Sequence, residues 1–142
     1  MGSEMCIRDR STYISPSMVS QAIVAEFGRS GAIDGSIETV KAALHERRDR
    51  LVDALGRHLP GTRFVSPEGG YFMWAELPDG TDSRALEDAA EERGVKIVKG
   101  SDFLIEGGGD ACRLAYSGVT PDQIDEGVSR LAAAVESLSG AS

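Results

Sequence analysis

The stretch RFVSPEGGYFMWAELP (residues 63–78) predicts a β-hairpin, and the other elements are arranged around it. Apolar and polar side chains alternate on both sides of Pro67–Gly70, which is the period of half-buried strands. Proline followed by adjacent glycines supplies the turn between them. Gly69 and Gly70 are either turn residues that need a positive φ or a place where the bare backbone comes close to a ligand.

Helical patterns flank this hairpin. The predicted helices cover 17–30, 36–59, 84–94 and a segment from 121 onward, and two further strands are predicted at 95–98 and 111–117. Ser36 is the expected N-cap of the second helix, and Thr120 with Gln123 forms a capping box before the last one. The order α, α, β, β, α, β, β, α predicts an α+β domain, with a mixed or antiparallel sheet of about four short strands covered by helices on one side.

Charge and composition exclude several classes of partner. The 142 residues carry a formal net charge of −8 with no cluster of basic residues, which argues against binding to nucleic acid or to an anionic membrane. No apolar stretch reaches the ~20 residues that are needed to span a bilayer. Beyond residue 10 the only cysteine is Cys112, so no disulfide within the chain is expected there and a reducing, cytoplasmic setting is favoured.

The first ten residues, MGSEMCIRDR, are expected to be foreign to the protein. Translated back into codons, with GTG read as a start codon, GTG GGC TCG GAG ATG TGT ATA AGA GAC AG resembles the transposase adapter used to prepare short-read sequencing libraries. It encodes Met1 to Asp9, and its last two bases begin the codon for Arg10. Such segments are excluded from reasoning about the fold. We therefore divide the chain into an adapter-derived segment at 1–10, a connecting helix at 11–35 and a domain at 36–142.

Arg113 is the strongest candidate for a functional residue. In ACRLAYS (residues 111–117) strand alternation places Cys112, Leu114 and Tyr116 on one face and Arg113 with its small neighbours on the other. A guanidinium framed by alanine and serine has room for a planar anion, and capture of a carboxylate by two parallel hydrogen bonds suits arginine best. From spacing alone, a structural ion pair with Asp110 or Asp122 is the more common arrangement.

Other reactive side chains form no recognisable site. His45 and His58 lie on the long predicted helix without further ligands at metal-binding spacing. The lysines are Lys41, Lys96 and Lys99, and none lies in an apolar, small-residue setting that would suggest a Schiff base. The glycines at 107–109 are followed by a strand and not by a helix, so a surface loop is expected and not a phosphate-binding loop.

Taken in series, these motifs resemble the C-terminal part of fold-type I pyridoxal-phosphate aminotransferases of class I/II. The resemblance rests on ERRDRL, SPEGGYFMWAELP, ALEDAAEERGVKIVKGSDF and CRLAYSGVTPDQIDEGVSRLA, and it covers the chain from about Gln21 to Leu138. Each motif alone is weak, whereas their order and spacing are specific. One departure is Lys99–Gly100, where the family usually has proline and glycine, so the loop to Phe103 is expected to differ locally.

The resemblance implies a small domain of aminotransferase type, in which Arg113 binds the α-carboxylate of the substrate and Gly69 and Gly70 border the substrate pocket. It implies an enzyme that moves an amino group between an amino acid and a 2-oxo acid, with pyridoxal phosphate as cofactor and a homodimeric parent protein. The family's cofactor lysine and phosphate-binding residues would lie upstream. No catalytic, cofactor-binding or metal-binding residue is therefore expected here, and the chain alone should be inactive.

Two other interpretations remain at this point. The same kind of domain also occurs in transcription regulators, where it senses an effector behind an N-terminal DNA-binding module. A free-standing α+β binding module is the third interpretation, and it requires a native start near Ser11.

Overall fold

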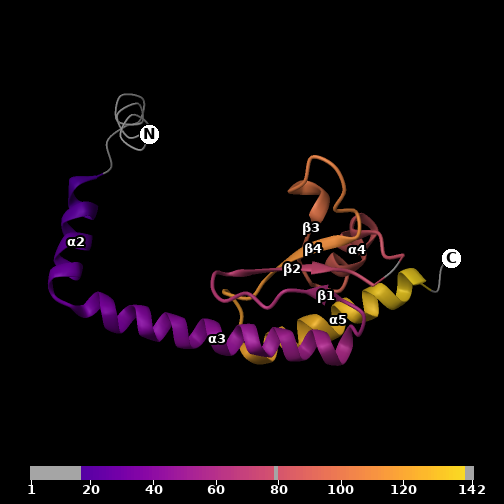
Figure 1. Cartoon of the computed structure of the whole chain (residues 1–142), viewed down its shortest axis with the longest axis horizontal. Coiled ribbons are helices and arrows are strands. Elements are labelled where there is room, and N and C mark those ends of the chain that lie inside the picture. Colours follow the sequence, from indigo (N-terminus) through magenta and orange to yellow (C-terminus); the bar gives the residue numbers. More distant parts are fainter. Residues whose placement is uncertain (1–16, 79, 140–142) are drawn as a thin grey trace. The chain divides into compact units, whose positions relative to one another are not determined.

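The computed structural model describes residues 17–78 and 80–139, so the predicted adapter segment lies outside the described residues. Contacts divide the chain after Val40 into two compact units. Over the described residues, the helices and strands follow one another in the predicted order (Figure 1). The predicted α+β class is therefore confirmed.

The first unit contains α2 (Met18–Arg29) and the beginning of α3 (Ala32–His58). No residue of α2 is buried, and its apolar side chains are exposed. The largest of them are Met18, Val19, Ile23, Val24 and Phe27. α2 thus contributes no buried side chain to a core within its own unit.

The junction between α2 and α3 corrects one prediction. α3 begins at Ala32, so Ser36 lies inside the helix and is not its N-cap. The backbone turns at Gly31, whose φ of 74° is readily adopted only by glycine. Ser30 then takes the capping role, because the Ala32 amide donates a hydrogen bond to its hydroxyl at 3.3 Å.

The second unit contains one antiparallel sheet with the strand order β1-β2-β4-β3. The strands are β1 (Arg63–Phe64), β2 (Phe72–Glu76), β3 (Val98–Lys99) and β4 (Ala111–Ala115). β1 and β2 form the predicted hairpin, with Arg63 opposite Glu76. β2 and β4 are the two central strands and pair over five residues each, which places Trp74 opposite Arg113.

Helices cover one face of this sheet and form a second layer (Figure 1). They are the C-terminal part of α3, α4 (Ser83–Glu91) and α5 (Pro121–Ser139). The side chains packed between the two layers include Leu51, Leu55, Met73, Leu86, Cys112, Leu114, Tyr116, Ile124, Val128 and Leu131. Among the described residues of this unit, no α-helix packs on the other face of β2 and β4.

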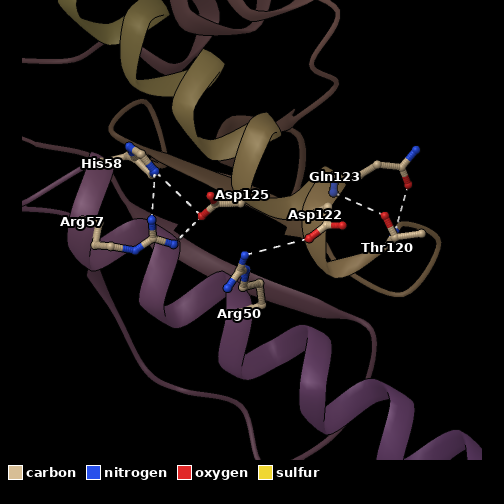
Figure 2. Close-up of polar contacts among 7 residues, drawn as sticks. All are labelled: Arg50, Arg57, His58, Thr120, Asp122, Gln123 and Asp125. Carbon is tan, nitrogen blue, oxygen red and sulfur yellow. Dashed lines mark hydrogen bonds and ion pairs between the residues drawn. The ribbon is translucent and has the colours of Figure 1, made fainter.

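The start of α5 is held by its cap and by polar contacts to α3 (Figure 2). The Thr120 amide donates to Gln123 Oε1 at 2.9 Å and the Gln123 amide donates to Thr120 Oγ1 at 3.3 Å, which confirms the predicted capping box. On α3, Arg57 donates a hydrogen bond to Asp125, and this contact lowers the pKa of the Asp125 carboxyl below its usual value. These contacts fix the helix that follows β4.

Candidate ligand site on the open face of the sheet

Successive side chains of β4 alternate between the face covered by helices and the open face of the sheet. Cys112 and Leu114 are buried against the helices, as is Tyr116 just after the strand. Arg113 and Ala115 point to the opposite face, as the sequence pattern predicts, because successive side chains of a strand lie on opposite sides. Arg113 is only partly exposed, since aromatic side chains surround its guanidinium.

The guanidinium of Arg113 lies over two phenylalanine rings. Its Cζ is 4.1 Å from the centroid of the Phe72 ring and 4.4 Å from that of Phe103. Phe72 comes from the neighbouring strand β2, whereas Phe103 follows the 3₁₀ turn η1 (Gly100–Asp102) after β3. Trp74, opposite Arg113 in register, meets the Phe103 ring edge-on at a centroid distance of 6.1 Å. We call Phe72 and Phe103 the aromatic pair.

No other described residue forms a hydrogen bond or an ion pair with the Arg113 side chain. The ion pair with Asp110 or Asp122 that spacing alone favoured is not formed within 17–78 and 80–139. Asp122 instead lies 4.0 Å from Arg50 Nη2 on α3 (Figure 2). As far as the described residues go, the N–H donors of Arg113 are therefore available to a ligand on the open face.

Gly69 and Gly70 lie in the loop between β1 and β2. Gly70 has a φ of 89°, which fits the turn interpretation, and a Cβ on either glycine would meet nothing within 4 Å. The Tyr116 hydroxyl donates to the Gly70 carbonyl oxygen at 2.9 Å, so the glycine is held by a residue three positions along the chain from Arg113. Both glycines also border a small cavity of about 140 Å³ that Arg48 and Tyr116 help to line.

Each of the three lysines of this chain has an interaction partner. Lys99 Nζ lies 2.7 Å from Glu87 and 3.2 Å from Asp102, and the hydrogen bond to Glu87 raises the pKa of Lys99. Lys96 is paired with Glu91 at 3.4 Å on the surface, and Lys41 also has a partner. A Schiff base needs an unprotonated amine, and the acidic partners of Lys99 disfavour that form.

The described residues offer neither a metal site nor a membrane span. Among them, no group of three or more His, Cys, Asp or Glu side chains could hold a metal ion. Within the same part of the chain, no helix is both long enough and apolar enough to cross a bilayer.

Comparisons with known proteins establish the family. The family model described as aminotransferase class I and II matches residues 4–131, so the chain belongs to the class I and II aminotransferases. The 2-aminoadipate transaminase of Thermus thermophilus is similar to this chain, with 35% identity over 123 residues, which are 85% of the chain and 31% of that enzyme.

A solved structure shows the same architecture. The α-aminoadipate aminotransferase LysN of Thermus thermophilus, complexed with N-(5′-phosphopyridoxyl)-L-leucine, superposes with a TM-score of 0.82 at 31% identity. The match covers 96% of this chain and 35% of that one. The fold of the two described units is thus that of part of a larger aminotransferase structure.

A similar protein of another class is the uncharacterized HTH-type transcriptional regulator YdfD of Bacillus subtilis. It is 29% identical over 133 residues, which are 93% of this chain and 27% of the regulator. Across these three comparisons the chain spans 27–35% of the length of the proteins it matches.

The aromatic surroundings of Arg113 were not predicted from the sequence. Strand alternation in FMWAE could have placed Phe72 and Trp74 on one face, but only the pairing of β2 with β4 brings that face to Arg113. Phe103 lies in a loop without periodicity, so no sequence signal marks its contact with the guanidinium.

Proposed function

We propose that this chain is the C-terminal part of a pyridoxal-phosphate-dependent aminotransferase, in which Arg113 binds the substrate α-carboxylate. The parent protein transfers an amino group between an amino acid and a 2-oxo acid. The observation that carries the proposal is the Arg113 guanidinium on the open face, which contacts aromatic rings and no described acceptor. The family membership supports the proposed aminotransferase activity of the parent protein. The match to only 31% of the length of the 2-aminoadipate transaminase supports the proposal that this chain is one part of a longer protein.

Arginine suits this role because its planar fork matches a carboxylate by two parallel N–H···O hydrogen bonds. Ala115, the next side chain on the same face, is too small to obstruct an approaching ligand. A carboxylate held at two points fixes the orientation of the bond to the substrate's α-carbon, and fixed orientation lowers the entropic barrier to reaction. This chain's contribution is therefore binding and orientation.

Pyridoxal phosphate, held by the rest of the parent protein, supplies the electron sink for the amino transfer. None of the three lysines here fits its attachment, so this chain alone is expected to be inactive. Gly69 and Gly70 are proposed as the border of the substrate pocket, since their bare backbone leaves space in the loop that precedes β2.

We further propose a cytoplasmic, homodimeric parent protein. The location is supported by Cys112, which is a free and fully buried thiol and needs no oxidising compartment. The dimer is supported by the family resemblance. No role in binding nucleic acid or membranes is proposed for this chain, whose net charge is −8.

The second candidate is an effector-sensing domain of a transcription regulator, which the likeness to YdfD favours. The two functions share this domain and differ in what precedes it. A long read of the source DNA upstream of the Ser11 codon separates them. A helix-turn-helix module at the start of the reading frame decides for the regulator, and its absence from a complete frame decides for the enzyme.

The experiment that tests the function uses the complete protein encoded by that reading frame. We expect it to convert amino acids to 2-oxo acids in the presence of pyridoxal phosphate and 2-oxoglutarate. Arg113→Gln should lower kcat/KM by about a hundredfold or more, because two hydrogen bonds to a charged group are lost. Arg84→Gln, which changes an exposed arginine on α4, is the matched control. A protein without transamination, or an Arg113→Gln variant equal to the control, would contradict the proposal.

A further inference from the structure

In the part of the chain that the structure describes, the contacts that hold Arg113 use none of its hydrogen-bond donors. Both members of the aromatic pair attract the guanidinium through the negative face of the ring. We propose that Phe72 and Phe103 are positioning residues, which immobilise the guanidinium before a ligand arrives and leave its N–H groups free. An acidic side chain could also immobilise it, but that side chain would occupy the donors that a carboxylate ligand needs.

The position of Phe72 follows from the sheet. Phe72 lies opposite Ala115, and Trp74 lies opposite Arg113 in the pairing of β2 with β4. The small Ala115 leaves space beside the Phe72 ring, into which the arginine two residues away can lean. Phe72 is therefore held at the start of β2 by backbone pairing with β4.

The position of Phe103 follows from a close crossing of two glycines. A Cβ on Gly100 would lie 2.7 Å from the Gly108 carbonyl oxygen, and a Cβ on Gly108 would lie 2.7 Å from the Gly100 carbonyl carbon. Both contacts are to backbone atoms, so neither position accepts a side chain without a shift of the loop. The Phe103 amide donates to the Gly100 carbonyl oxygen at 3.0 Å, which ties the ring to this crossing.

The crossing is itself anchored to α4. The Ser83 amide donates to the Gly109 carbonyl oxygen at 2.7 Å. The hydroxyl of the buried Ser83 donates to the Gly108 carbonyl oxygen at 3.3 Å. At the other end of the turn, Lys99 pairs with Asp102. The loop after β3 is thus attached on both sides, although Phe103 itself remains 44% exposed.

Immobilisation before binding has a consequence for affinity. A flexible arginine loses side-chain freedom when it captures a ligand, and that loss weakens binding. An arginine already held by two rings has lost this freedom in the folded state, so its hydrogen bonds contribute more fully. The statement that the ligand is a carboxylate rests on the proposed function, whereas the immobilisation of Arg113 does not.

The test measures the mobility of Arg113 in the full 142-residue chain by NMR of the arginine Nε–Hε groups. We expect an order parameter of about 0.8 for Arg113, with Hε shifted by the ring currents, and a value below about 0.6 for the exposed Arg84. Phe103→Leu should lower the Arg113 value to that of Arg84, because it keeps apolar bulk and removes the ring. Phe103→Tyr should restore it, and Ile105→Ala, which removes a fully exposed side chain of the same loop, should leave it unchanged.

A second pair of variants moves Phe103 without altering its ring. Gly100→Ala should lower the Arg113 order parameter as Phe103→Leu does, whereas Gly109→Ala should not, since a Cβ there meets nothing within 4 Å. If the Gly100→Ala variant does not fold, the Arg113 order parameter of Phe103→Leu still tests the proposal. An Arg113 that is as ordered in Phe103→Leu as in the unchanged chain would overturn the proposal.

Ligand binding forms the last part of the test, with propionate as probe and propionamide as its uncharged control. We expect the Arg113 Nε–Hε signal to respond to propionate alone, with an affinity about fivefold lower in Phe103→Leu. Equal affinities in both proteins would overturn the positioning role and leave the carboxylate site intact. An ordered Arg113 that ignores propionate would support the immobilisation and contradict the carboxylate role in the proposed function.

Discussion

The two faces of the central strands β2 and β4 differ in what holds their side chains. On the covered face, Met73 and Cys112 are at most 1% exposed and belong to the core between the sheet and the helices. On the open face, Arg113 and Trp74 lie in the same register but contact mainly aromatic rings and solvent. Neighbouring residues of one strand thus lie in different surroundings, and we expect single substitutions to affect either the stability of the domain or the proposed ligand site, but not both.

The largest effect is expected on the covered face. Leu114→Ala should lower the free energy of unfolding by about 2–5 kcal/mol, because it removes buried methyl groups and leaves a cavity between the sheet and the helices. Urea denaturation monitored by circular dichroism measures this change. A loss below about 0.5 kcal/mol, the cost of an ordinary surface substitution, would mean that the covered face is not the core.

A smaller effect depends on pH and concerns Cys112, the neighbour of Arg113 on the covered face. Burial raises the pKa of the Cys112 thiol to about 12. In an unfolded chain the pKa of a cysteine thiol is about 8.5. The buried neutral thiol therefore contributes its full stability below about pH 8.5 and loses it as the pH rises toward the folded value.

At pH 10 the thiol ionises in the unfolded state but not in the folded state. The free energy of unfolding should therefore be about 1–2 kcal/mol lower at pH 10 than at pH 8. Lys99 and Tyr116 also titrate in the alkaline range, since the pKa of each is raised. Comparing Cys6→Ser protein with and without Cys112→Ala isolates the thiol, because the other two groups are present in both. Identical alkaline losses in the two proteins would show that Cys112 is not shielded from water.

The smallest effect on stability is expected at Arg113 itself. Arg113→Gln should change the free energy of unfolding by no more than about 1 kcal/mol, because it removes cation–π contacts at a partly exposed site and no ion pair. The same urea denaturation that is used for Leu114→Ala measures it. A loss as large as that of Leu114→Ala would erase the distinction between the two faces.

The sequence predicted most of the elements because their signals are local. The hairpin at 63–78 and the capping box at Thr120 and Gln123 follow from alternation, turn residues and side-chain caps within a few residues. The start of α3 was predicted too late in the chain because Ser36 has the chemistry of an N-cap. In the structure the helix begins at Ala32, after the turn at Gly31, and the Ala32 amide donates to the Ser30 hydroxyl.

The site could be predicted only in part. Alternation along β4 identified the face on which Arg113 lies, and the family resemblance gave it a role. The aromatic pair could not be predicted, because the contact with Phe103 depends on the crossing of Gly100 and Gly108, which are eight residues apart in a loop. Such a contact arises from backbone packing and leaves no periodic pattern.

The crossing of Gly100 and Gly108 also makes the segment between these two glycines suitable for redesign. Residues 101–107 leave the sheet and return to it at positions fixed by Gly100 and Gly108, and most of them are exposed. Doubling the length of such a closed loop costs only about 0.6 kcal/mol in closure entropy. We therefore expect that substitutions and insertions can vary the composition and length of this segment beside Arg113, provided that an aromatic ring remains at position 103, while the strands on either side stay in place.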